Sequence, residues 1–377
     1  MIASIAFAVM LVAAPAPNSS QDARRSASTA PRAATFEQLA QTAAQAREQA
    51  RDDDAIVAYR AALKIKPDWE EGLWFLGTTL YQKERYAEAR DELRRFLTLA
   101  PNAGAGWAVL GMAEYQTREY SRALDHLKRS MRLGVADRQE LLNSVRYFMS
   151  VLLTRFSSFE DATGMFYEMR ASGQPEALLL EPAGLAVLRL PLLPEEIPSD
   201  RREMVSTAGS VAFALADQRQ AEAQKLLEEL TTKYPHEPGI HYLYGVFLMK
   251  ISPEDGIGEL QRELQISPSH IPARVRIAEQ YVKESRFDEA QPLLDDALAL
   301  DARNASAHML LGEALMAKGK PADAIRELEA AREQAPDTVR IRWDLVRAYS
   351  AVGRTADADR EKKYMEKQEL RTGFDQY

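Results

Sequence analysis

Alanine recurs at a fixed interval of 34 residues in two stretches of this chain. The marker positions are Ala55, Ala89 and Ala123 in the first stretch and Ala290, Ala324 and Ala358 in the second. Around each marker the apolar residues follow the spacing of an amphipathic helix. A period of this length indicates a fold that is built by stacking copies of one helical unit.

Two further kinds of residue keep the same phase. Several units have a proline twelve residues after the marker, namely Pro67, Pro101, Pro235 and Pro336. Because proline cannot continue a helix, each one closes a unit. Several units also have a small residue twelve residues before the marker, namely Ala43, Gly77, Gly111, Ala278 and Gly312. This pattern predicts two antiparallel helices per unit, whose backbones approach closely at the two small residues.

The repeated pattern resembles the tetratricopeptide repeat, a helix-turn-helix unit of 34 residues. Trp107, Leu110, Gly111 and Ala123 stand where that family's pattern asks for them, although Val135 occupies the place of the closing proline. The resemblance implies an all-α fold. We expect a right-handed α-solenoid of about eight to nine helix-turn-helix units with an irregular insertion in the middle of the chain.

The markers divide the chain into segments. We predict three units over residues 36–137, a degenerate unit over 138–174, a Pro- and Leu-rich insertion over 175–203, and five units over 204–372 that end in a polar capping helix. The later full units begin at residues 70, 104, 204, 238, 271, 305 and 339. We interpret the insertion as a plug that packs on the adjoining helices. The alternative is a hinge or docking element.

The N-terminal segment predicts export. Residues 2–14 are apolar, and this run is too short to span a bilayer but suits the core of a secretory signal. We therefore predict a signal peptide over 1–20, a flexible linker over 21–35, and a periplasmic or secreted protein with no stable transmembrane span in the mature chain. A mis-assigned start or an uncleaved anchor are the alternatives, and the first would leave the protein in the cytoplasm.

Composition excludes several classes of protein. The chain has 377 residues and no cysteine, so disulfides, thiolate metal sites and cysteine nucleophiles are impossible. Lys and Arg number 48 against 56 Asp and Glu, which gives a net charge of −8. This mildly acidic balance argues against a general nucleic-acid binder, and we expect no nucleic-acid partner.

No motif in the chain supports catalysis. The phosphate-binding GxxxxGK[ST] loop, the zinc-binding HExxH pair and the GxSxG nucleophile elbow are all missing from the sequence. The five histidines do not share a helical face, and we interpret them as structural or solvent-exposed. We therefore expect no catalytic, cofactor or metal site. The alternative is an enzyme with an unrecognised site at 138–203.

The sequence does offer a candidate binding surface. In the family that the chain resembles, the first helix of each unit lines a concave groove that binds a protein or peptide. The phase places these aromatic, methionine and arginine residues on that face: Trp74, Phe75, Tyr81, Met112, Tyr115, Tyr147, Phe148, Tyr242, Arg340 and Trp343. Such side chains are favoured at interaction hot spots. The alternative is that some of these rings pack between successive first helices.

We therefore expect a non-catalytic scaffold for protein–protein interaction that assembles or supports a cell-envelope complex. The alternative function is a cytoplasmic adaptor or regulator.

Overall fold

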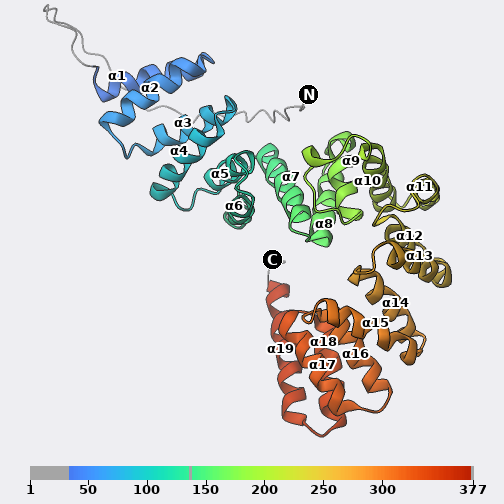
Figure 1. The fold of residues 1–377 in the computed structure, drawn as a ribbon. Helices are drawn as coiled ribbons and strands as arrows, with labels where there is room; N and C mark the ends of the chain where they lie inside the picture. Colours follow the sequence, from blue (N-terminus) through green and yellow to red (C-terminus); the bar gives the residue numbers. More distant parts are fainter. Residues whose placement is uncertain (1–33, 136–137, 375–377) are drawn as a thin grey trace, which may run out of the picture. The chain divides into compact units, whose positions relative to one another are not determined.

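A computed structural model describes residues 34–135 and 138–374, with side chains up to Lys367 (Figure 1). The described residues form nineteen α-helices and one short 3-10 helix, and they contain no strand. The expected all-α repeat fold is therefore confirmed. The predicted signal peptide and most of the predicted linker lie outside the described residues.

The chain divides into two compact units, residues 1–209 and residues 210–377. We refer to them as the first unit and the second unit, and to the 34-residue repeats as repeats. The helices of the first unit are α1 (Phe36–Glu48), α2 (Asp52–Ile65), α3 (Glu70–Gln82), α4 (Tyr86–Leu99), α5 (Gly104–Gln116), α6 (Tyr120–Leu133), α7 (Gln139–Arg155), α8 (Phe159–Ala171), α9 (Glu176–Val187) and the 3-10 helix η1 (Pro194–Glu196). Helix α10 (Arg202–Ala216) crosses the boundary.

The second unit continues the same alternation of helices. Its elements are α11 (Gln220–Lys233), α12 (Ile240–Leu248), α13 (Pro253–Ile266), α14 (Ile271–Lys283), α15 (Phe287–Leu300), α16 (Ala305–Ala317), α17 (Pro321–Gln334), α18 (Val339–Ala351) and α19 (Thr355–Phe374). In both units each helix packs on its neighbours in the chain, as it does from α1 to α9 and from α11 to α19. Contacts of this kind produce a stack of helix pairs.

The small residues hold the two helices of a pair together. A Cβ atom on Gly111 would lie 2.7 Å from Leu127 Cγ, and one on Gly312 would lie 2.6 Å from Leu328 Cγ. The marker alanine of the same pair is fully buried, as Ala123 and Ala324 show. Only a small residue, glycine in these pairs and alanine at Ala43 and Ala278, allows this approach, so the phase deduced from the sequence places the correct residues in contact.

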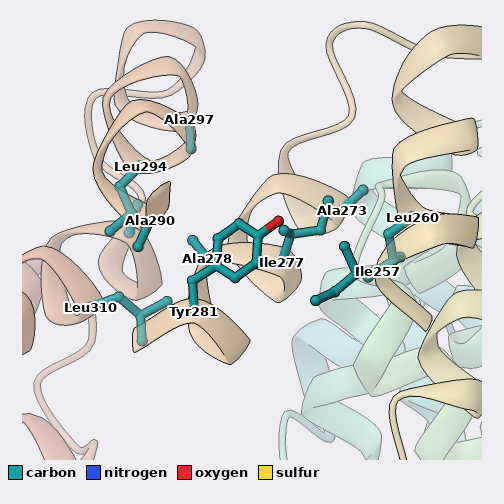
Figure 2. Close-up of a cluster of buried hydrophobic side chains, with 11 residues drawn as sticks. Ile257, Leu260, Ala273, Ile277, Ala278, Tyr281, Ala290, Leu294, Ala297 and Leu310 are labelled. Atoms are coloured by element: carbon teal, nitrogen blue, oxygen red, sulfur yellow. The ribbon is translucent and has the colours of Figure 1, made fainter. Parts of the chain in front are cut away.

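Larger apolar residues fill the layers between pairs. In the second unit, Tyr281, Leu294 and Leu310 are buried together with the alanines Ala278 and Ala290. Figure 2 shows how side chains from four consecutive helices, α13 to α16, meet in this cluster. Because each layer is shared by neighbouring pairs, the core is continuous along the stack and has no single centre.

The fourth residue of several repeats ties its helix to the preceding turn. Trp107 Nε1 donates to the Pro101 carbonyl oxygen at 2.9 Å, and Arg342 Nε donates to the Pro336 carbonyl oxygen at 2.9 Å. His241 Nε2 lies 3.0 Å from the Pro235 carbonyl oxygen and occupies the same place in its repeat. The side chain thus satisfies a carbonyl group at the end of the previous helix.

The histidines are used in the same structural way. His308 repeats the contact of His241, with Nε2 3.2 Å from the Ala302 carbonyl oxygen. His126 Nδ1 lies 2.6 Å from Glu114, and the ring of His270 accepts a hydrogen bond from the Ala273 amide at the start of α14. His236 is exposed.

A charged network joins helices α4, α5 and α6 at the turn between the last two. Glu119 accepts from Arg90 at 2.6 Å and from Arg94 and Arg122 at 2.8 Å each. Burial by itself raises the pKa of Glu119, but the hydrogen bonds from Arg94, Arg122 and Arg90 outweigh it and lower the pKa to about 2. This carboxyl therefore binds a proton less readily in the folded chain than in the unfolded one.

We expect the Glu119 network to make folding acid-sensitive. Since the unfolded pKa is about 4.3, the contribution is complete above that pH and is lost as the pH falls towards about 2. With 21% of the side chain exposed, solvent screening leaves about 1 to 2 kcal/mol. Urea unfolding at pH 7 and pH 3 should show a smaller loss of stability for Glu119→Gln than for the wild type. Glu37→Gln, on exposed surface, is the control, and equal losses in all three chains would contradict the prediction.

Candidate interaction surfaces

The predicted surface residues of the first unit differ in exposure. Trp74, Phe75 and Tyr81 on α3 are half-buried. The other four, on α5 and α7, are buried, with 2 to 8% of their surface exposed: Met112, Tyr115, Tyr147 and Phe148. All seven residues lie on first helices, as expected. Those on α3 are partly accessible to solvent, whereas those on α5 and α7 are not.

The α3 rings make contacts inside the fold. The ring centroids of Trp74 and Phe96 are 5.3 Å apart, and the guanidinium of Arg47 lies 3.6 Å from the centre of the Phe75 ring. Burial raises the pKa of Tyr81, whose ring packs on Tyr86 at 5.3 Å. Phe75 therefore packs on the preceding first helix, α1, as the alternative interpretation has it, whereas Trp74 and Tyr81 pack on α4, the second helix of their own pair.

A hollow lies beside Trp74 at the first turns of α3 and α5. Its volume is ≈ 560 Å³, and its aromatic lining residues are Trp69, Trp74 and Phe96. A Cβ on Gly72 would lie 2.1 Å from Trp69 Cε3, and one on Gly106 would lie 2.6 Å from Phe96 Cε1. Both rings thus rest against glycine backbone. Lys66 and Arg138 oppose Asp68, Glu70 and Glu71 around the rim, so the hollow has no single charge sign.

The insertion contacts α5 and α7. Tyr115 Oη donates to Glu195 Oε1 at 3.0 Å, and Arg155 Nη1 donates to the Pro191 carbonyl oxygen at 2.7 Å. Leu193 and Ile197, which come from the same segment, are 0 and 5% exposed. The segment therefore folds back onto the first helices of its own unit, and its role as a plug or as a docking element stays a prediction.

The contact with Glu195 affects the pKa values of the tyrosines on α5 and α7. The pKa of Tyr115 is raised, first by burial and then by the adjacent Glu195 carboxylate, and the same two causes raise the pKa of Tyr147. Phe148 packs against both tyrosine rings, at 4.8 and 5.5 Å between centroids. Tyr115, Tyr147 and Phe148 are 7 to 8% exposed with residues 188–197 in place. Whether they bind a partner remains a prediction.

The second unit presents a row of apolar side chains from four consecutive first helices. Each is the fifth residue of its repeat: Tyr242, Val275, Met309 and Trp343. The first three are half-buried, and Tyr242 lies 4.6 Å from the His270 ring. Trp343 is 53% exposed, which is unusual for so large an apolar residue.

The arginines beside this row are paired within the fold. Arg340 donates twice to Glu313 at 2.8 Å and lies 3.7 Å from Glu279, while Arg347 pairs with Asp344. The pKa of Glu313 is raised, mainly because the carboxyl is buried, although Arg340 acts in the opposite direction. The positive charges of Arg340 and Arg347 are therefore largely compensated.

In the part of the chain that the structure describes, no group of three His, Asp or Glu side chains could hold a metal ion. Across the same residues, no helix is both long enough and apolar enough to cross a membrane.

Antiparallel helix pairs stacked at a period of 34 residues define a helical-repeat protein. Two family descriptions of the tetratricopeptide repeat match the chain, one over residues 76–134 and the other over 281–342 and 315–361. These matches identify tetratricopeptide repeats in both units of the chain. No curated relative matches the sequence.

Solved structures of MamA are similar to parts of the chain. One crystal structure of MamA is 21% identical, with a TM-score of 0.39, and the match covers 43% of this chain and 96% of that one. A second is 21% identical, with a TM-score of 0.37 over 53% and 94%. A MamA RS-1 double mutant is 18% identical, with a TM-score of 0.40 over 44% and 94%. These values are too low to assign a particular superhelix or role.

Proposed function

We propose that this protein is a non-catalytic scaffold that binds a protein partner along the first helices of its second unit. Tetratricopeptide repeats are in general modules of protein–protein interaction, and the matches to that family support this broad role. The observation that carries the finer proposal is the row ending at Trp343, where the indole is 53% exposed beside half-buried Met309 and Val275.

The chemistry of the row favours an apolar partner surface. Tryptophan gives a large contact area at a low cost in side-chain entropy and is enriched at binding hot spots. The neighbouring ion pairs of Arg340 and Arg347 can form the polar rim of such an interface. A partner helix or extended segment that supplies aliphatic or aromatic side chains at the spacing of the repeats would cover all four residues.

We expect Trp343→Ala to weaken partner binding by about 2 kcal/mol while changing the free energy of unfolding by less than about 1 kcal/mol. The matched control is Val339→Ala, because Val339 lies on the same helix and is also 53% exposed. Cross-linking and quantitative capture from the cell-envelope fraction would measure binding, and urea unfolding would measure stability. Equal capture by both variants and the wild type would contradict the proposed surface.

The proposed location is outside the cytoplasm, in the assembly or support of an envelope complex. It rests on the apolar run over 2–14 and the linker composition that follows it. Mass spectrometry of the native protein should find a new N-terminus before residue 36. An intact Met1 on protein recovered from the cytoplasm would contradict export and favour the cytoplasmic adaptor.

A further inference from the structure

We infer that residues 188–197 are a displaceable internal ligand of the first unit. In this inference they occupy a second binding surface on α5 and α7. The partner that replaces them has a short acidic turn with two aliphatic side chains about four residues apart. The inference rests on the proposed function only in assuming that the chain binds protein, and it concerns a different surface.

Two aliphatic anchors hold the C-terminal half of the segment, and Leu188, at its first position, is also buried, with 1% exposed. Leu193 and Ile197 are 0 and 5% exposed, whereas Pro191, Glu195 and Glu196 around them are exposed. Both anchors have extended backbone, with φ and ψ of −88° and 154° at Leu193 and −65° and 120° at Ile197. The 3-10 turn η1 separates the two anchors, so the segment is a short turn that is fixed on both sides by a buried aliphatic side chain.

The polar contacts to the segment come from the ends of the first helices. Tyr115 Oη lies 3.0 and 3.2 Å from the two carboxylate oxygens of Glu195. Arg155, at the end of α7, donates to the Pro191 carbonyl oxygen at 2.7 Å and lies 3.4 Å from Glu196. These two side chains thus bind one backbone carbonyl and two acidic side chains of the segment. A partner with the same groups could use the same donors.

The charge beside the segment also favours an acidic ligand. A second hollow, of ≈ 500 Å³, adjoins Arg155 and is lined by Arg118, Arg122, Tyr120 and Phe156, with Glu119 as its acidic residue. Arg118 is exposed, and Phe156 is 46% exposed. Glu195 and Glu196 therefore face a surface with an excess of arginine. An acidic partner would meet the same electrostatic attraction.

The way the segment is held is compatible with release. The ion pair between Arg155 and Glu196 is at the surface, where both side chains are more than a third exposed, and such pairs are individually weak. At the start of the segment, Arg189 pairs with Glu160, whose side chain is 74% exposed. Release of the segment would break the contact between Glu195 and Tyr115.

The first experiment measures release in the full chain. Because the protein has no cysteine, a single Leu193→Cys substitution reports opening through its rate of reaction with a thiol reagent. Adding Glu195→Ala should accelerate labelling at least tenfold, since it removes the contact with Tyr115. Adding Asp200→Ala, at an exposed position just beyond the segment, should leave the rate unchanged. Equal rates in all three chains would show that the segment is a permanent part of the core and would overturn the inference.

The second experiment tests the partner chemistry with a fluorescent synthetic peptide of residues 188–198. It should bind at least tenfold more tightly to the Leu193→Ser/Ile197→Ser chain than to the wild type, and a scrambled peptide should bind neither. Circular dichroism of each chain confirms folding, and Ile197→Cys with Glu195→Ala replaces the labelling pair if Leu193→Cys is unstable. Faster labelling without peptide binding would overturn the proposed partner chemistry. Capture through Trp343 is measured separately, so either surface can fail alone.

Discussion

Glu361→Ala is expected to lower the free energy of unfolding of the second unit by about 3 to 5 kcal/mol. Glu361 on α19 is 6% exposed and forms ion pairs with Arg342 on α18 and Arg332 on α17. The Arg342 guanidinium also lies 3.4 Å from the centre of the Tyr364 ring and is itself almost fully buried. Removal of the carboxylate leaves this cation without its counter-ion in a site that water cannot solvate.

Two further variants make this expectation specific to the buried charge. Asp359→Ala removes a carboxylate from the same helix, but Asp359 is 73% exposed and its partner Lys362 is 3.5 Å away, so we expect a change within about 0.5 kcal/mol. Arg342→Met/Glu361→Leu removes the two buried charges and leaves Arg332, which is 29% exposed, so it should recover much of the loss. Urea unfolding measures all three. A Glu361→Ala chain as stable as Asp359→Ala would show that the carboxylate contributes nothing net.

The repeat period predicts the helix pairs because the information it carries is local. Gly111 and Ala123 are twelve residues apart, so one turn between two helices is enough to bring them together. The same reasoning applies to the buried layers of Figure 2, where Ala278 and Ala290 repeat that spacing. The position of a residue within the 34-residue repeat therefore predicts its contact with the other helix of the pair, without any knowledge of the rest of the chain.

The cover on the first unit could not be predicted in this way. Glu195 and Tyr115 are 80 residues apart, and no period relates the insertion to α5. The phase correctly places Tyr115, Tyr147 and Phe148 on first helices, yet it cannot show that residues 188–197 return to bury them. The Pro- and Leu-rich composition of the insertion was the available signal. It indicated packing but did not identify the surface.

The tight turns within the pairs could have been located from glycines that occur at one position of the repeat. Glu84, Arg118 and Ser285 have positive φ values of 58 to 64°, a region that favours glycine. Gly319 and Gly353 hold the same place in later repeats, with φ of 71 and 75°. Alignment of the repeats at these glycines would have located the left-handed residue that ends each first helix.

Gly111→Leu is expected to destabilise the first unit by about 3 kcal/mol or more, at the upper end of the range for overpacking. A Cβ at Gly111 would lie 2.7 Å from Leu127 Cγ and 3.1 Å from the Ala123 carbonyl oxygen, so α5 and α6 must separate to admit the new side chain.

Gly164→Leu is the matched control. Gly164 also lies within a helix, but a Cβ there meets nothing within 4 Å, and replacement should stabilise α8 by about 0.5 to 1 kcal/mol. Hydrogen exchange should accelerate in α3 to α8 of the Gly111→Leu chain before it changes in α16 and α17, because each repeat contacts only its neighbours. Unchanged unfolding of Gly111→Leu, or the same loss in Gly164→Leu, would show that close helix approach at this glycine does not hold the pair together.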